Sequence, residues 1–347
     1  MAGSSTKVVV IAFLMNLCIA VAKFIGYFLS GSAAMLAEGV HSVADTTNQV
    51  FLYLGIRKSK QTPTRRHPFG YGMEQYIFSF LVAMLIFSLG GIYSLYEGVH
   101  KLLHPADGID NPEINLVILG IGILLDGYSA LAATKEVNKL RGNMSIGKYI
   151  RKSKDQILVT VFFEDYAALF GLGIAATGTV LYLVTGNVLF DTIATLLIGV
   201  LLMVIAGFLY YEAKSLLLGE AADPEDLAKI EQAFLEHPKV DALRELLTMH
   251  LSATQILVNA HVKFKPGLTL EQVEDIIDEI EVKIIADVPL VYKIFIETHQ
   301  NAQVIPLQSD PTPGEHHTPI EGTNAAEAPS LKRSAISSPK KNHGEES

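Results

Sequence analysis

The amino-acid sequence predicts an all-α membrane domain of six spanning helices, followed by a small cytoplasmic α+β domain with the element order α-β-β-α-β. Half of the 347 residues are hydrophobic, 18% are charged and the mean hydropathy is +0.33, which is too apolar for an ordinary soluble protein. The charge is uneven, because residues 220–302 carry 16 acidic and 7 basic side chains. This acidic balance disfavours nucleic acid as a partner.

Six apolar windows have the length of about 20 residues that a spanning helix needs. They cover Val8–Leu29, Ala33–Ile56, Ile77–Val99, Ile114–Ala133, Ile157–Val184 and Val188–Tyr211. The short turns at Ser30–Ser32 and Thr185–Asn187 predict two tight antiparallel hairpins. Lys23 lies inside the first window, and its long side chain is expected to reach the membrane surface; pairing with an acid is the alternative.

Basic residues predict the orientation of these windows in the membrane. Residues 57–66 carry five basic side chains and residues 135–154 carry seven, whereas the loops of the opposite side carry only Lys101. Basic loops stay in the cytoplasm, so both termini are expected there, or in the equivalent compartment of an organelle. The absence of a basic, acid-poor presequence favours a bacterial inner membrane over an organellar one.

The segment that follows the last window has the pattern of a small α+β domain with an open-faced sheet. Asp223-Pro224-Glu225 resembles a helix start, and the apolar positions behind it fit one helical face: Leu227, Ile230, Phe234 and Leu235. Residues 256–264 alternate between apolar and polar, which is the period of a strand. Thr269–Ala286 has the pattern of a second amphipathic helix, and Val291–Thr298 that of another strand.

Composition sets the expected domain limits. From Gln303 the sequence is rich in Pro, Ser, Glu, His and Lys, a composition that cannot bury a core and is expected to be disordered. We therefore assign residues 1–214 to the membrane domain, 215–302 to the cytoplasmic domain and 303–347 to a tail. The single cysteine, Cys18, excludes an intramolecular disulfide and a cysteine-cluster zinc site.

Polar residues inside two of the apolar windows predict a site in the membrane, because charges there are costly unless they have a function or a partner. His41 and Asp45 are four residues apart, so one helix presents both on the same face. An imidazole and a carboxylate placed in this way suit a divalent cation. A hydrogen-bonding pair between two helices is the alternative.

The fifth window contains the adjacent acids Glu164 and Asp165 among aromatic and aliphatic residues. Two such carboxylates require protonation or a shared cation, which favours metal or proton chemistry. Asp126 is an isolated acid in the fourth window, and three roles stay open for it: completing the cation site, relaying protons, or bonding to a neighbouring helix.

These motifs resemble the cation diffusion facilitator family. The resemblance is carried by Ser32–Gln49 (SAAMLAEGVHSVADTTNQ), Leu54–Arg57 (LGIR), His67–Gly72 (HPFGYG) and Leu158–Asp165 (LVTVFFED). The first, second and fourth are similar to the branch that contains the ninth human zinc transporter and its bacterial relatives. Together with the six windows and the α-β-β-α-β order, the resemblance extends over about Lys7–Gln300.

The resemblance implies a homodimeric transporter in the lipid membrane that exchanges a divalent cation for protons and has a metallochaperone-like dimerisation domain at residues 215–302. His41, Asp45 and Asp165 match three of its metal ligands. The fourth, often a histidine, falls on Val161, so Glu164, Asp126, Asn48 or water must replace it. Oxygen in place of nitrogen keeps zinc as the first candidate but admits manganese, iron(II) or cobalt.

Two further metal positions follow from the same resemblance. His67 and Tyr71 stand where some relatives have two histidines, and a structural role for His67 is favoured. In the cytoplasmic domain His261, Glu297 and His299 fall near regulatory ligand positions, with His250 close by; they are either a metal site between protomers or half-exposed strand residues. We expect no enzyme activity, because the HExxH set of a metallohydrolase is absent. A non-conducting membrane metal sensor is the alternative function.

Overall fold

A computed structural model describes residues 2–30, 33–104, 108 and 112–298 of the chain. Within the first two helices it leaves the side chains of 2–4, 26–27, 29–30, 33–41 and 44 undescribed. His299 and the predicted tail at 303–347 therefore lie outside the described residues, as does the side chain of His41.

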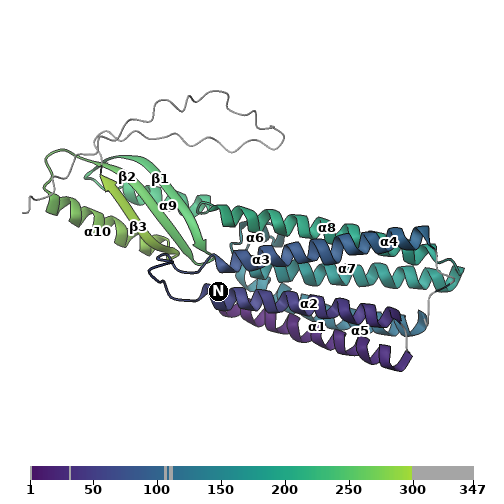
Figure 1. Cartoon of the computed structure of the whole chain (residues 1–347). Coiled ribbons are helices and arrows are strands. Elements are labelled where there is room, and N and C mark those ends of the chain that lie inside the picture. Colours follow the sequence, from purple (N-terminus) through teal and green to yellow (C-terminus); the bar gives the residue numbers. More distant parts are fainter. Residues whose placement is uncertain (1, 31–32, 105–107, 109–111, 299–347) are drawn as a thin grey trace, which may run out of the picture. The chain divides into compact units, whose positions relative to one another are not determined.

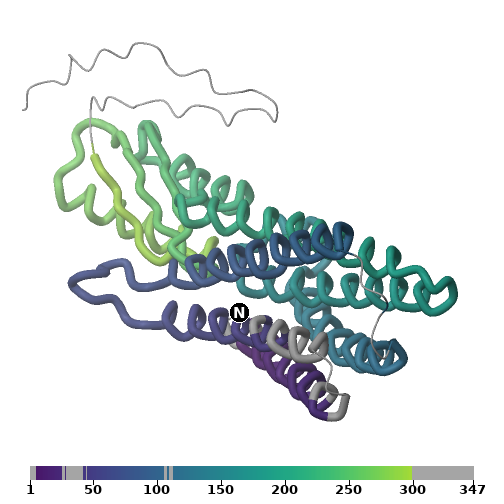
Figure 2. Tube along the Cα trace, turned by 45° about the vertical axis from the view of Figure 1, so that its right-hand side comes forward, coloured from purple at the N-terminus to yellow at the C-terminus, as the bar shows by residue number. Residues whose placement is uncertain are grey.

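Long helices form the first part of the chain (Figure 1). In order they are α1 (Ala2–Ser30), α2 (Ala33–Ser59), α3 (Glu74–Leu85), the π-helical η1 (Ile86–Ile92), α4 (Tyr93–Leu103), α5 (Pro112–Leu140), the short α6 (Ile146–Lys152), α7 (Gln156–Thr185) and α8 (Leu189–Leu218). The elements α3, η1 and α4 run on as one rod, and α1 and α2 lie side by side (Figure 2).

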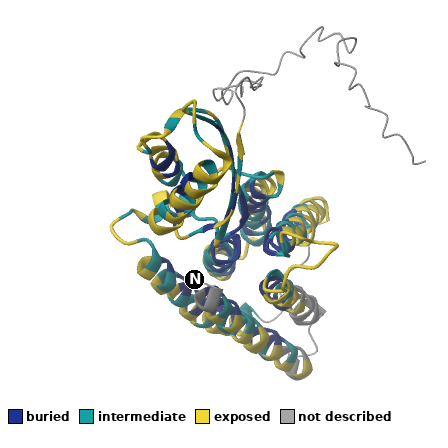
Figure 3. Ribbon diagram, turned by 90° about the vertical axis from the view of Figure 1, so that its left-hand side faces the viewer, coloured by how far each residue is buried: buried dark blue, intermediate teal, exposed yellow. Residues whose placement is uncertain are grey.

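Five helices of the described residues are long and apolar enough to cross a membrane. They start at Ser5, Glu74, Pro112, Gln156 and Leu189, which confirms a polytopic helical membrane domain. The 27-residue α2, whose side chains at 33–41 and 44 are not described, is not among them. The long helices carry many exposed residues (Figure 3). Large apolar side chains are among them, as expected for surfaces in contact with lipid.

The π-helical segment was not predicted, since the sequence pattern there indicates only an apolar helix. Gly90 and Gly91 lie in it and are both buried. A Cβ at Gly91 would lie 2.5 Å from Cγ of Met203 in α8. The glycines thus allow α8 to approach the π-helical backbone closely, a packing arrangement that a larger residue at either position would disturb.

Side-chain caps and glycines define the ends of α7 and α8. Asp155 precedes α7, and its Oδ1 accepts a hydrogen bond of 3.2 Å from the backbone N–H of Leu158. The other carboxylate oxygen of Asp155 accepts a hydrogen bond from Ser5 of α1. Gly186 and Gly219 end the two helices with φ of 71° and 99°, a left-handed conformation that glycine adopts without strain.

The second part of the chain contains α9 (Pro224–Leu235), β1 (Val240–Ser252), β2 (Gln255–Phe264), α10 (Leu270–Asp287) and β3 (Val291–Thr298). The sheet order is β1-β2-β3; β1 is antiparallel to β2, and β2 is parallel to β3. The predicted alternation along β2 is confirmed, because Ile256, Val258, Ala260 and Val262 are all buried in the domain core.

Both helices of this domain pack their apolar residues on that face of the sheet (Figure 1). Ile230 and Phe234 of α9 are fully buried, as are Ile276, Ile280 and Ile284 of α10. The prediction for Leu235 is wrong: it is 57% exposed, because it follows Phe234 and a helix turns about 100° per residue. A capping box between Thr269 and Gln272 fixes the start of α10.

Candidate metal centre

Glu164 of α7 is held by two amide side chains of α2. Its Oε1 accepts a hydrogen bond of 3.0 Å from Nδ2 of Asn48, and its Oε2 accepts one of 2.7 Å from Nε2 of Gln49. Asn48 and Gln49 are both buried. Hydrogen bonds of this kind hold a carboxylate in a fixed direction, so Glu164 is oriented toward α2.

Asp165, the next residue, is bound to α5 instead. It is 4% exposed, and its Oδ2 accepts a hydrogen bond of 2.8 Å from Oγ of Ser129. Asp126 lies one turn before Ser129 on α5 and is 5% exposed. Two adjacent residues of α7 therefore connect to two different helices, as the turn of about 100° per residue requires.

The four predicted carboxylates are electrostatic neighbours. Asp45 interacts with Asp126 and with Glu164, Asp126 also interacts with Asp165, and Asp165 with Glu164. Like charges buried among helices repel one another, and the arrangement is stable only when protons or a cation neutralise them. The chemistry of this group of side chains is therefore cation binding, proton binding or the exchange of one for the other.

His41 lies on α2 four residues before Asp45, but its side chain is outside those that the structure describes. Among the described side chains, no three His, Cys, Asp or Glu groups converge on one ion position. The described carboxylates among the predicted ligands thus share a region formed by α2, α5 and α7 without converging on one ion position. Val161 is fully buried one turn before Asp165, and its alkyl side chain offers no ligand atom.

The expectation for Lys23 is wrong. Its side chain is buried, with 8% exposure, and it interacts electrostatically with Asp126 rather than reaching the membrane surface. A buried ammonium group needs a counter-charge, and Asp126 lies in the group of carboxylates that supplies one. Lys23 of α1 is therefore a neighbour of the group of carboxylates, as in the alternative of pairing with an acid.

In the cytoplasmic domain the structure brings His261 and Glu297 together and adds a third residue. His261 Nε2 lies 3.1 Å from a carboxylate oxygen of Glu297, and Nδ1 lies 3.2 Å from one of Glu245. The strand register places Glu245 and Glu297 on either side of His261. Glu245 was missed because its pairing with His261 depends on the antiparallel register.

Two further histidines, His250 and His67, interact with residues close to them in the sequence. The predicted partner His299 lies outside the described residues. His250 is 3% exposed and its Nδ1 lies 3.3 Å from the carbonyl oxygen of Ser252; burial, together with the nearby charge of Lys154, lowers its pKa. In the loop after α2, His67 Nδ1 lies 3.0 Å from the hydroxyl of Tyr71, an interaction that gives His67 a structural role.

Apolar helices around a buried group of acids define the class of this protein: an integral membrane protein with an internal polar site. Residues 9–218 match the cation efflux transmembrane domain, and residues 222–299 match the cytoplasmic domain of cation efflux proteins. The chain belongs to the cation efflux family, also known as the cation diffusion facilitators, as its motifs indicate.

Named relatives place it nearer one branch of that family. Over 263 residues it is 36% identical to the human "Proton-coupled zinc antiporter SLC30A9, mitochondrial", covering 74% of this chain and 46% of that protein. Over 269 residues it is 32% identical to "Metal tolerance protein C4" of Arabidopsis thaliana, covering 77% and 59%. "Zinc transporter ZitB" of Yersinia pestis is 25% identical over 278 residues, covering 78% and 83%. The chain thus spans about half the length of its SLC30A9 relatives.

Proposed function

We propose that this protein transports a divalent metal cation across a membrane in exchange for protons, with zinc as the first candidate substrate. The observation that carries the proposal is the group of four neighbouring carboxylates contributed by α2, α5 and α7 inside a membrane domain. The printed names of several relatives describe zinc transport. Manganese, iron(II) and cobalt are further candidate substrates, because the side chain of Val161 supplies no nitrogen ligand.

The ligand set that we propose combines the predicted residues. His41 and Asp45 of α2 and Asp165 of α7 bind the ion, and Glu164 or Asp126 supplies the remaining oxygen. In the cytoplasmic domain, a regulatory cation bound by His261, Glu297 and His299 remains part of the proposal. The contact that supports it is the pairing of His261 with Glu297 at 3.1 Å.

We further propose that α2 is the sixth span. It lies along α1, its partner in the predicted hairpin, and it provides Asn48 and Gln49 to the buried Glu164. Six spans with basic loops inside put both termini on the cytoplasmic side, or on the equivalent side in an organelle. The mitochondrial relatives do not favour the bacterial inner membrane of the sequence-based prediction, so we propose no particular membrane.

The proposed cycle starts on the side of the basic loops, where a cavity of about 390 Å³ is lined in part by Asp155, Gln75 and Ser5. A cation that reaches the site displaces protons from His41 and the carboxylates, because ligands bind metal in their deprotonated form. Rocking of the helices exposes the site to the other side. Protons there compete with the cation for the same groups and return.

Flux in proteoliposomes tests this function. With an imposed pH gradient, the purified protein is expected to move zinc into vesicles and to release protons in the opposite direction, measured with one fluorescent indicator for each ion. Manganese, iron(II), cobalt and cadmium are compared in the same assay. Zinc that binds to the protein without any flux of any of these metals would contradict transport and support the alternative of a non-conducting metal sensor.

We propose that the protein is a homodimer and that its cytoplasmic domain contributes to the dimer. The described part of this domain has its own core, centred on Phe234, Ile256 and Ile280. We also propose that the membrane domain ends at residue 214 and the cytoplasmic domain at residue 302, although the helix α8 continues to Leu218.

The isolated fragment Ala222–Gln300 is expected to fold and to dimerise in solution, because its core requires no residue of the membrane helices. Metal ions are expected to favour the dimer by partly neutralising its acidic charge. Analytical ultracentrifugation and circular dichroism with and without zinc check both points. The matched variant Phe234→Ala should lose about 3–5 kcal/mol of stability. A wild-type fragment that stays monomeric and disordered in millimolar zinc would contradict the prediction.

A further inference from the structure

Three aromatic side chains follow one face of α4 toward its C-terminal end. The rings of Tyr96 and His100 are stacked with centroids 6.2 Å apart, and those of His100 and His104 with centroids 4.9 Å apart and an interplanar angle of 27°. All three side chains are exposed. None of them belongs to the group of carboxylates between α2, α5 and α7, so they form a separate cluster of side chains.

The spacing of the two histidines suits a metal ion. Residues four apart on a helix lie one above the other, and two histidines at this spacing are the pair that binds zinc in HExxH helices. The stacked rings of His100 and His104 show that both side chains lie on the same side of the helix. The backbone N–H of His104 still donates to the carbonyl of His100, at 2.9 Å, which keeps the pair in register.

The local charges favour a cation at this position. α4 ends at Leu103, and the C-terminal end of a helix carries the negative end of its dipole. The nearby ammonium of Lys101 is paired with the carboxylate of Asp191 of α8 at 3.1 Å. This pairing reduces the repulsion that Lys101 would otherwise exert on an ion held by the two histidines.

Close packing against α8 holds the first half of α4 in place, before the turn that carries the two histidines. A Cβ at Gly98 would lie 2.6 Å from Cδ2 of Leu196, and a Cβ at Gly199 would lie 2.9 Å from the backbone nitrogen of Leu95. The two helices therefore touch through glycines on both sides. A pair of ligands on a helix that is held in this way loses little freedom when it binds an ion.

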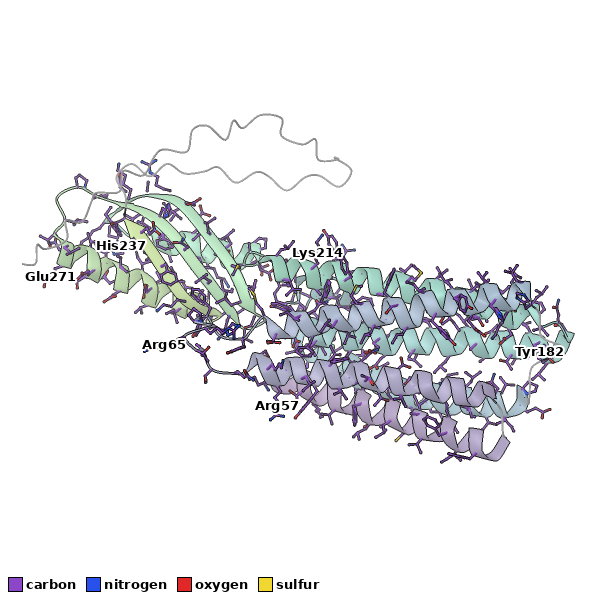
Figure 4. The ribbon with its side chains drawn as sticks, viewed as in Figure 1. Arg57, Arg65, Tyr182, Lys214, His237 and Glu271 are labelled. Carbon is purple, nitrogen blue, oxygen red and sulfur yellow. The ribbon has the colours of Figure 1, made fainter. Side chains whose placement is uncertain are left out.

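The pair lies at the end of the helix bundle opposite the basic loops. Lys101 of α4 contacts Asp191 in the first turn of α8, and that turn follows directly after the end of α7. Figure 4 labels Tyr182 near this end of α7 and Arg57 at the other end of the bundle. In the proposed orientation this end is the face on which the transported cation is released.

We propose that His100 and His104 form a second divalent-cation site on this release face, selective for ions that favour imidazole, such as zinc, copper(II) and nickel. Within the described residues no third His, Cys, Asp or Glu side chain completes the set. The ion is held weakly and exchanges with solution. Binding at this pair does not depend on transport, and its failure is therefore distinguishable from failure of the proposed function.

The test uses the full-length protein in lipid nanodiscs and copper(II) iminodiacetate as the probe, a chelate with free positions for two imidazoles. Wild-type protein is expected to bind one more chelate per chain than the variant His100→Gln/His104→Gln, with two imidazole nitrogens on that copper in pulsed electron paramagnetic resonance. His104→Gln alone should weaken this binding at least about tenfold, since the second contact is intramolecular.

A relocation variant is the matched control. His104→Gln/Leu102→His keeps the number of histidines but places them two residues apart, on different sides of α4, and should bind as weakly as His104→Gln alone. Thermal unfolding of each variant verifies that the exposed substitutions leave the fold intact. Equal copper binding by wild type and the His100→Gln/His104→Gln variant, or full binding by the relocation variant, would overturn the proposal.

Discussion

Replacing Asp45 by alanine is expected to lower zinc flux at least about 100-fold while the protein remains a folded dimer. Asp45 of α2 interacts with the carboxylates of both α5 and α7. Even partners outside the ligand shell contribute about 10–100-fold to metal affinity or activity, so the loss of a ligand should cost no less. Stability is expected to hold, because the substitution removes a like charge from a group of acids.

The measurement is initial zinc uptake by proteoliposomes that contain equal amounts of dimer, as judged by size-exclusion chromatography. Thr47→Ala is the matched control, since Thr47 is an exposed residue of the same helix and its hydroxyl donates only to the carbonyl of Val43 within α2. If Asp45→Ala takes up zinc as fast as Thr47→Ala, Asp45 is not a ligand of the transported ion.

The second large effect concerns the acid that replaces the missing fourth ligand. Glu164→Ala is expected to weaken transport more than Asp126→Ala. Position 161 lies about one turn before Glu164 on α7, and Glu164 is directed toward α2, the helix that carries Asp45. Asp126 interacts with Lys23 in addition to other acids, which favours a role as counter-charge of that ammonium.

The variant Glu164→Gln distinguishes the loss of a metal ligand from a loss of protein stability. Alanine leaves the buried amides of Asn48 and Gln49 without their partner, at a cost of about 1–3 kcal/mol each. Glutamine keeps an acceptor oxygen there but removes the negative charge. Both variants should lose flux if Glu164 binds the ion, whereas only alanine should lower the unfolding temperature strongly. Greater damage by Asp126→Ala than by Glu164→Ala would show that this assignment is wrong.

The variant Val161→His with Glu164→Ala tests the same position with a nitrogen ligand. It is expected to recover zinc flux and to prefer zinc over manganese more than the wild type does, because imidazole suits zinc and oxygen suits manganese. Val161 is fully buried, so the larger ring costs about 1–3 kcal/mol in packing. Uptake of both metals is compared with Glu164→Ala alone. A double variant without zinc uptake would contradict the prediction.

The residues of the candidate site that were predicted from sequence are those with an unusual chemistry for a membrane helix. Acids among aliphatic residues, such as Asp126 and Asp165, stand out in one sequence without any structure. Of the groups that donate hydrogen bonds to Glu164 and Asp165, only Asn48 was a candidate from sequence, whereas Gln49 and Ser129 were missed. Gln49 follows Asp45 by four residues and Ser129 follows Asp126 by three, so helical spacing from the acids is the signal that would have found both.

In the fold, too, features that depend on neighbouring residues were predicted, and features that depend on distant segments were not. The alternation of β2 and the start of α10 at Thr269 depend on local patterns, and both were predicted to within a residue or two. The close approach of Gly91 in η1 to Met203 of α8 joins distant parts of the chain, and the pairing of Glu245 with His261 depends on strand register. Contacts between distant segments of this kind leave no periodic pattern in the chain.

The polar sequence of α2 has a consequence for how the protein is made. A charged residue at the centre of a helix costs about 2.5–3.5 kcal/mol when that helix enters the membrane, and α2 carries Glu38 and Asp45. We therefore expect α2 to be inserted poorly by itself and to depend on α1, which lies along it. The bonds from Asn48 and Gln49 to Glu164 form only after α7, more than 100 residues later, has left the ribosome. In the proposed six-span topology, completion of the candidate site during synthesis would then also complete the integration of α2 into the bilayer.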